Sequence, residues 1–392
     1  MKRSWSVMLV WLGLQAVVCG QETVRIGLYQ GLHFTEASAS LTSGTYDVLV
    51  DGISKGTVTA PLHLTAKTVR GVLVSDAGHT WNGTHKVEFR ARTGTCTFQL
   101  KPGLSSAKRQ PYTGSLVVRH YRGKLVLINQ LDVEQYVSGV VEAETGRGRE
   151  LEFYKAQAVI SRTYALGNKN RHEKQGFHLC DQVHCQVYHG TARYDELIPT
   201  ASKATQGLVI VDADIELITA AFHANCGGQT VSSGYVWSKP LPYLTAVQDT
   251  FCLSMPSSHW EKRLSTSEWD AYLKRKSSPD ITLPDTLNYG PDWQPSDKTM
   301  YFTQDSVRIK LTEVRTDLKL RSCWFSVHQE GNQTVLVGRG FGHGVGMCQQ
   351  GAIRRAERGQ DFRDILHAYY TNVHVIPVSQ IPFFKAPSSP EP

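Results

Sequence analysis

The segment LDVEQYVSGVVEAETGRGRELEFYKAQAVISRTYAL, residues 131–166, contains two consecutive helical patterns separated by a short glycine-containing break. Apolar side chains recur at three- and four-residue spacing in the first pattern: Val133, Tyr136, Val137, Val140 and Val141. This spacing places them on one face of a helix. Residues 150–166 repeat the helical period and are rich in small side chains, which favours close packing of the two predicted helices.

Glu144 extends the apolar face of the first predicted helix, whereas Glu142 lies on the other side. A carboxylate that leaves water among valines favours its neutral form, so its pKa rises and it becomes suited to general acid catalysis. The alternative is a glutamate at a frayed helix end that reaches solvent. Position along the helix therefore makes Glu144 a candidate catalytic residue without excluding the simpler interpretation.

The residues before these helices predict β structure. Residues 23–28 and 46–50 alternate apolar and polar side chains, and residues 115–121 and 124–128 flank the dipeptide Arg122-Gly123 as a hairpin would. Further strands are predicted at 208–211, 217–222 and 335–337, and a helix is predicted at 267–276. Runs of strands with a segregated helical part indicate an α+β fold rather than a doubly wound sheet.

The N-terminus has the pattern of an export signal. Lys2 and Arg3 precede the apolar run 5–18, which is short for a membrane span and ends in Cys19-Gly20. Residues 1–20 are therefore predicted to be a signal peptide cleaved near Gly20, with a lipidated Cys19 as the alternative. We expect an exported protein that is periplasmic or associated with the cell envelope.

Composition excludes some partners. The chain has 392 residues, and 41% of them are apolar. It contains 42 Lys and Arg residues and 35 Asp and Glu residues, which gives a net charge of +7. This charge is spread thinly, whereas nucleic-acid binding normally requires denser basic stripes with interleaved aromatic residues. A mild positive balance suits a polyanionic cell-wall surface, although a generic solvated surface would have the same composition.

Mixed His and Cys residues suggest a metal site. His172, Cys180, His184 and Cys185 supply the donor atoms of a tetrahedral zinc set. Adjacent ligands are geometrically awkward, and in an exported protein a Cys180–Cys185 disulfide or free thiols are the alternatives. Four protein ligands would leave no coordination position for water, so the zinc would be structural. The other cysteines, Cys96, Cys226, Cys252, Cys323 and Cys348, are dispersed along the chain.

A glycine-rich segment lies near the other end of the chain. Five glycines alternate with other residues across 338–346, and His343 is in their middle. The segment is not a phosphate loop, because no Gly-Lys-Ser/Thr follows it. We expect His343 either to face a groove or to make a hydrogen bond inside a tight turn. His223 and residues 225–229 form a second glycine-containing element that is expected to line the same cleft.

Three ordered segments together resemble the stage II sporulation protein D (SpoIID) family, which includes the LytB amidase enhancers. They correspond to the family's Gly-Val-Val-x-x-Glu-Met segment at 139–145, its Ala-Gln-Ala-x-x-x-Arg-Thr-Tyr-Ala helix at 156–165 and its Gly-His-Gly-Val-Gly-Met-Ser-Gln loop at 342–349. The resemblance covers roughly residues 110–375. It implies a β-rich N-terminal region at 21–110 and a SpoIID-like domain at 111–380 with an insertion at about 255–300.

The resemblance implies a lytic transglycosylase that cleaves denuded peptidoglycan strands between N-acetylmuramic acid and N-acetylglucosamine and leaves 1,6-anhydro ends. Glu144 matches the family's catalytic glutamate, and the metal set matches a zinc site recognised in some members. The expected substrate-binding residues are Arg162, His343 and Gln349, which lie in the matching motif segments, and His223 of the second glycine-containing element. The alternative is a wall-binding module that assists a separate N-acetylmuramoyl-L-alanine amidase. Thr145 replaces the family's Met, and Cys226 and Cys348 stand where Ser is usual.

Overall fold

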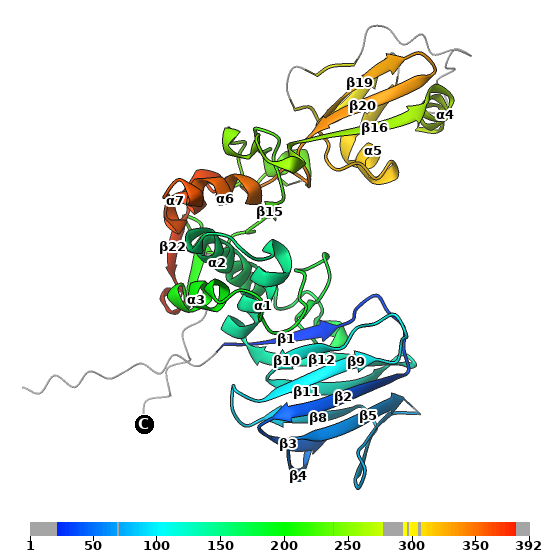
Figure 1. Ribbon diagram of the computed structural model, residues 1–392, viewed down its shortest axis with the longest axis vertical. Helices are drawn as coiled ribbons and strands as arrows, with labels where there is room; N and C mark the ends of the chain where they lie inside the picture. Colours follow the sequence, from blue (N-terminus) through cyan, green and yellow to red (C-terminus); the bar gives the residue numbers. More distant parts are fainter. Residues whose placement is uncertain are drawn as a thin grey trace, which may run out of the picture.

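The computed structural model describes residues 22–68, 70–237, 239–276, 293–295, 298–304 and 307–381. The predicted signal peptide lies outside these residues. Figure 1 shows three tiers along the longest axis of the molecule: a β-sandwich, a helical middle tier and a smaller α+β unit. In the described part of the chain, no helix has the length and apolar character needed to cross a membrane. The mixture of segregated strands and helices confirms the predicted α+β class.

The larger sheet of the sandwich has the strand order β13-β1-β12-β11-β8-β3-β4. Its strands are β1 (Thr23–Leu28), β3 (Thr45–Val50), β4 (Ile53–Thr59), β8 (Lys86–Ala91), β11 (Ser115–Tyr121), β12 (Lys124–Asp132) and β13 (Leu179–Cys180). The predicted hairpin is confirmed, because Arg122 and Gly123 connect β11 to β12 with φ values of 49° and 80°. Two consecutive positive φ angles give the turn the twist that an antiparallel pair requires.

The smaller sheet has the order β10-β9-β2-β5-β6-β7. Its strands are β2 (Glu36–Ser43), β5 (Leu62–Thr68), β6 (Val72–Ser75), β7 (Thr80–Gly83), β9 (Thr97–Pro102) and β10 (Gln110–Thr113). The two sheets pack on each other: Trp81 of β7 meets Phe89 of β8 edge-on with ring centroids 5.5 Å apart. The Tyr46 hydroxyl also donates to the Thr97 carbonyl at 2.9 Å.

The larger sheet crosses the predicted boundary between residues 110 and 111. β11 pairs with β8, and β12 pairs with β1, so strands from both sides of this boundary share one hydrogen-bonded sheet. The segment 179–180 returns as β13 beside β1. The β-rich N-terminal region is therefore continuous with the part of the chain that leads into the helices.

The helical middle tier begins where β12 ends. Its helices are α1 (Val133–Thr145), α2 (Leu151–Gly167), α3 (Leu197–Ala204), α6 (Gln349–Glu357) and α7 (Phe362–Tyr369). Two short strand pairs accompany them: β14 (Leu208–Val211) with β22 (His374–Pro377), and β15 (Phe222–His223) with β21 (Met347–Cys348). The predicted strand at 217–222 is reduced to a bridge at Leu217 and the start of β15.

The smaller α+β unit has a core of its own. It contains β16 (His259–Ser265), α4 (Thr266–Lys276), β17 (Tyr301–Gln304), β18 (Val307–Lys310), α5 (Leu311–Asp317), β19 (Phe325–Glu330) and β20 (Gln333–Arg339). Trp269 of α4 is fully buried and meets Phe302 of β17 edge-on at 5.4 Å. Because β16 pairs with β20, this unit continues to Arg339, well beyond residue 300. Part of the predicted insertion, including residues 277–292, lies outside the described residues.

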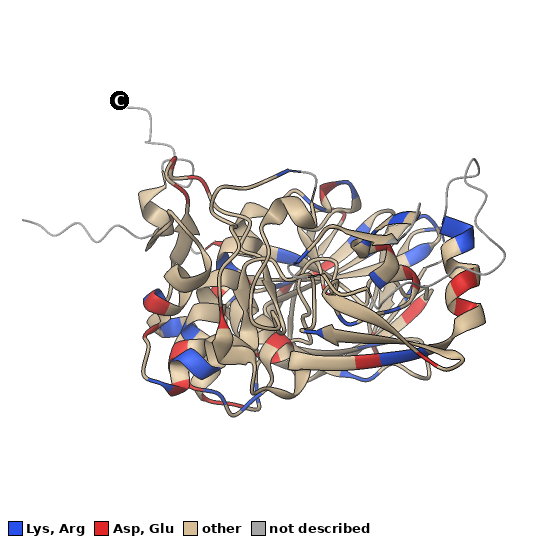
Figure 2. Ribbon diagram, turned by 90° about the horizontal axis from the view of Figure 1, so that it is seen from above, with Lys and Arg blue, Asp and Glu red and all other residues tan. Residues whose placement is uncertain are grey.

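Charged residues of both signs are distributed over the described part of the chain. Figure 2 shows Lys and Arg interspersed with Asp and Glu, without a continuous basic stripe over the described residues. The expectation of a thinly spread positive charge therefore agrees with the structure.

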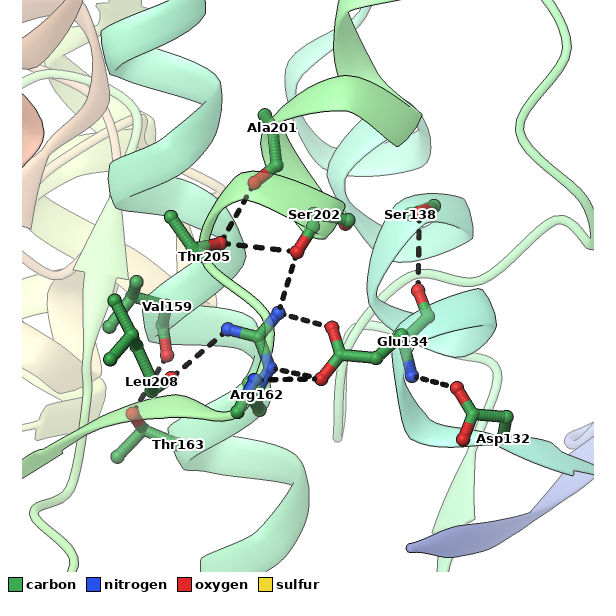
Figure 3. Close-up of polar contacts among 11 residues, drawn as sticks. Asp132, Glu134, Ser138, Val159, Arg162, Thr163, Ala201, Ser202, Thr205 and Leu208 are labelled. Atoms are coloured by element: carbon green, nitrogen blue, oxygen red, sulfur yellow. Dashed lines mark hydrogen bonds and ion pairs between the residues drawn. The ribbon is translucent and has the colours of Figure 1, made fainter. Parts of the chain in front are cut away.

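Arg162 connects the helices of the middle tier (Figure 3). Its side chain is fully buried, and its Nε donates to Glu134 Oε1 of α1 at 2.8 Å while Nη2 pairs with the other carboxylate oxygen. Nη1 and Nη2 also donate to the carbonyls of Leu208 (3.0 Å) and Ser202 (3.4 Å). The guanidinium is thus occupied by protein partners, and the expectation that Arg162 contacts substrate stays a prediction.

We predict that Glu134→Ala destabilises the protein by about 3–5 kcal/mol, because it leaves the Arg162 charge buried without its partner. Glu357→Ala is the control, since the Glu357–Arg354 pair is exposed and such pairs contribute about 1 kcal/mol or less. Urea-induced unfolding of both variants measures the difference. Equal losses of stability would show that the buried pair has no special role.

Candidate functional site

Glu144 lies in the last turn of α1 and is half-buried. Its Oε1 accepts a hydrogen bond from the Val187 N–H at 2.7 Å. Burial raises the pKa of Glu144, and the Val187 N–H, which favours the carboxylate, limits this rise. An anchored, partly desolvated carboxyl group differs from the frayed and solvated helix end that the sequence left open.

Glu142 has a different environment two residues earlier. Its Oε2 accepts hydrogen bonds from the backbone N–H groups of Arg193 (2.9 Å) and Tyr194 (2.7 Å). It therefore fixes the loop before α3 and lies away from Val187. The two glutamates occupy separate faces of α1, as the helical spacing predicted.

The predicted metal ligands converge beside this helix. His172, Cys180, His184 and Cys185 each present a donor atom, and these atoms all lie within 4.8 Å of one another. Cys185 Sγ is 3.4 Å from His172 Nε2 and 3.7 Å from His184 Nδ1, and Cys180 Sγ is 3.7 Å from the same Nδ1. Zinc bonds of ordinary length in a tetrahedron separate sulfur from nitrogen by about 3.5 Å. The donor set therefore fits a tetrahedral metal ion.

Three further observations support this fit. Cys180 and Cys185 are free thiols in the structure, and the consecutive residues His184 and Cys185 both direct their donor atoms into the cluster. The Gln175 Oε1 lies 2.8 Å from His172 Nδ1, which orients the ring so that Nε2 faces the cluster. Because all four positions would come from protein, the site is closed to water.

The ligand-bearing segment also positions the contact to Glu144. Val187 follows Cys185 by two residues, and the next residue, Tyr188, is buried with its hydroxyl 2.9 Å from Asn129 Oδ1. On the other side, Asp181 accepts the backbone N–H groups of Tyr29 and Gln30 at 2.5 and 3.1 Å. The β-sandwich thus holds both flanks of the segment that presents the Val187 N–H.

The glycine-rich segment forms a tight loop between β20 and β21. At Gly342 (φ 115°) an added Cβ would lie 2.7 Å from the His223 Cβ, and at Gly346 (φ 69°) it would lie 2.1 Å from the Ala221 carbonyl oxygen. Only glycine permits this backbone conformation together with such close approach. The loop therefore packs directly on the segment that carries His223.

His343 lines a pocket next to this contact. Its ring centroid lies 5.6 Å from that of His223 and 5.8 Å from that of Trp237, and its Nδ1 accepts the Val345 N–H at 3.1 Å. Burial lowers the pKa of His343 to about 4, so the imidazole is neutral near pH 7. The pocket is also lined by Asn225, Tyr235, Lys298, Trp324 and Arg339. Both sequence alternatives for His343 hold, since it makes a turn hydrogen bond and faces a pocket.

The four predicted substrate-binding residues do not form one surface. His223 is buried beside His343, with its Nδ1 3.1 Å from the Val345 carbonyl oxygen. Gln349 Nε2 donates to Gln157 Oε1 at 3.3 Å and links α6 to α2. Arg162 is in the core, and Glu144 is not among the residues that line the His343 pocket. The side chain of His223 is buried in this conformation, and the expectation that it contacts substrate stays a prediction.

Sequence reasoning missed the residues that act through the backbone or from distant segments. Val187 contributes its N–H, which no side-chain pattern reveals. Lys298 reaches the pocket from the region of the predicted insertion, where its Nζ donates to the Cys226 carbonyl at 2.9 Å. The only sequence signal for Val187 was its proximity to Cys185 along the chain.

Comparison with known proteins matches residues 121–211 to the model described as "Stage II sporulation protein". An uncharacterized protein of Brachyspira hyodysenteriae is 31% identical over 276 residues, 69% of this chain and 73% of that protein. Stage II sporulation protein D of Bacillus subtilis is 26% identical, with 72% and 84% covered. The amidase enhancer of the same organism is 29% identical over 60% of this chain but only 39% of its own length. By its motifs and these relatives, the chain belongs to the stage II sporulation protein D family.

Proposed function

We propose that the protein is a peptidoglycan lytic transglycosylase that acts on glycan strands without stem peptides. The observation that carries this proposal is the anchored, half-buried Glu144, whose pKa burial raises. A carboxyl group that keeps its proton toward neutral pH can protonate a leaving oxygen. Export to the periplasm or cell envelope, where this substrate lies, is part of the proposal.

In the proposed reaction Glu144 transfers its proton to the glycosidic oxygen as the bond to C1 of N-acetylmuramic acid breaks. The resulting carboxylate then accepts the proton of the muramyl 6-hydroxyl while that oxygen bonds to C1. The products are a free N-acetylglucosamine hydroxyl and a 1,6-anhydro end, and Glu144 regains its acid form. One carboxyl group suffices because the internal hydroxyl replaces the water that other glycosidases activate with a second carboxylate.

Zinc is proposed as the ion held by His172, Cys180, His184 and Cys185. When bound, the ion supplies folding energy rather than a nucleophile, because the four protein ligands close its coordination sphere. The segment after Cys185 then positions the Val187 N–H so that it donates a hydrogen bond to the Glu144 carboxyl group. The same closed set argues against a zinc amidase, which needs an open position for water.

The second candidate function is a module that binds glycan and assists an N-acetylmuramoyl-L-alanine amidase. It is favoured by one observation, the similarity to a protein named amidase enhancer. In that role the His343 pocket would bind the cell wall, and Glu144 would not act as a catalytic acid.

We predict that Glu144→Gln reduces release of soluble fragments from denuded glycan by about 10²-fold or more, because an amide cannot donate the proton. Glu142→Gln is the matched control and should retain activity near that of the unaltered protein, since Glu142 only fixes a loop. Both variants should keep the same unfolding temperature. Undiminished fragment release by Glu144→Gln would exclude Glu144 as the acid.

The pH dependence of cleavage should report the hydrogen bond from Val187. Activity requires protonated Glu144, so the rate falls as the pH rises through the pKa of this group. Val187→Pro removes the N–H that favours the carboxylate, which raises the pKa and moves this falling limb to higher pH. Val187→Ala keeps the N–H and should leave the limb in place. A limb that does not move in Val187→Pro, with activity retained, would assign it to another group.

Loss of the metal should destabilise the segment at 172–188. We predict that Cys185→Ser lowers zinc content by one equivalent and Tm by about 5 °C or more, because metal binding at a closed site contributes to folding. Val183→Ser is the control, since Val183 lies between the ligands but is 84% exposed. Mass spectrometry and thermal unfolding measure both quantities. Unchanged zinc content in Cys185→Ser would reject the assignment.

A further inference from the structure

A second group of sulfur and oxygen donors lies in the main core, near the points where the chain enters and leaves the smaller unit. Cys226, Cys252, Cys348 and Asp249 are at most 2% exposed. Their donor atoms all lie within 4.8 Å of one another. Cys226 Sγ is 3.4 Å from Cys252 Sγ and 3.6 Å from Asp249 Oδ2. These separations are close to the edges of a tetrahedron of sulfur and oxygen ligands around one metal ion, about 3.5–3.8 Å.

The surroundings are arranged as an outer shell for anionic ligands. The backbone N–H groups of Cys226 and Gly351 both donate to Cys348 Sγ, at 3.2 and 3.3 Å. The Tyr369 hydroxyl donates to Asp249 Oδ2 at 2.8 Å, which fixes this carboxylate. Such outer hydrogen bonds orient metal ligands and stabilise their charged forms. Gly351 also leaves the space that Asp249 occupies, because an added Cβ would lie 2.1 Å from Oδ2.

A bound cation would balance the charge of this donor set in its ionised form. Three thiolates and one carboxylate cannot remain ionised in a dry core without compensation. Arg355 Nη2 lies 3.5 Å from Asp249 Oδ1, and Lys298 Nζ donates to the Cys226 carbonyl at 2.9 Å, so two positive groups already adjoin the cluster. A divalent cation would neutralise the rest. A single disulfide would use only two of the three sulfurs and would leave the third beside the carboxylate.

We propose that Cys226, Cys252, Cys348 and Asp249 form a second closed site for a thiophilic divalent cation, zinc in the first instance. The sulfur-rich donor set selects this class of ion over calcium or magnesium. This site is separate from the cluster at 172–185 and does not depend on the proposed transglycosylase activity.

The position of the site defines its role in the fold. Cys252 ends the short helix η3 (Thr250–Cys252), and Cys348 is the N-cap of α6. The smaller unit, from β16 to β20, lies between these two cysteines in the sequence. Cys226 follows β15, which pairs with β21 at the end of the glycine loop. A bound cation would therefore hold together the two chain ends that enter and leave the smaller unit, next to the loop carrying His343.

The test is the zinc content of the full chain, purified with zinc and a reducing agent but without chelator. We expect two zinc equivalents in the unaltered protein. Cys252→Ser should lose the equivalent bound at the second site and keep the one bound at 172–185. Cys185→Ser should lose the equivalent bound at 172–185 and keep the one at the second site. Cys96→Ser is the control, because Cys96 is equally buried but lies in the β-sandwich, and it should keep both equivalents. Equal zinc content in the unaltered protein and in folded Cys252→Ser would overturn the proposal.

A second measurement decides the matter where Cys252→Ser does not fold. The unaltered protein is treated with an alkylating reagent before and after zinc removal, and the modified peptides are identified by mass spectrometry. We expect Cys226, Cys252 and Cys348 to become reactive together on removal of zinc. A peptide pair linked through Cys226 and Cys252, with no protection that depends on metal, would show a disulfide and overturn the metal site.

Discussion

The hydrogen bond from the Val187 N–H to Glu144 is the interaction on which the proposed chemistry depends. It joins the end of α1 to the segment that follows the first His–Cys cluster, and the β-sandwich fixes both flanks of that segment through Asp181 and Tyr188. Burial raises the pKa of Glu144, while the Val187 N–H favours the carboxylate and limits this rise. A group that must both give and take a proton requires such an intermediate environment.

Local patterns predicted most of the fold near the site. The period of residues 131–166 gave both helices, and the dipeptide Arg122-Gly123 gave the hairpin, because each signal depends on neighbouring residues alone. The extent of the smaller unit was not predictable in this way. It depends on the pairing of β16 with β20, which joins residues about seventy positions apart in the sequence.

The candidate site was predictable where its side chains form a local sequence motif. It was not predictable where tertiary packing determines which residues come together. The spacing of His172 to Cys185 suggested a donor set but left a disulfide open, and the structure brings the four donor atoms together. Arg162 lies in a motif segment and His223 in the second glycine-containing element, and packing buries them against Glu134 and His343, which no local pattern shows. The convergence of Cys226, Cys252 and Cys348 could not be predicted from their dispersed positions. It requires the smaller unit, which lies between Cys252 and Cys348 in the sequence, to form a separate core.

The central claim is that the protein cleaves glycan by forming an internal ring, and product identity tests it most directly. Purified protein is incubated with glycan strands stripped of stem peptides, and the soluble fragments are weighed by mass spectrometry. A lytic transglycosylase gives fragments that end in 1,6-anhydro-N-acetylmuramic acid, one water lighter than hydrolysis products. Fragments with ordinary reducing ends, or intact strands that remain bound to the protein, would contradict the account.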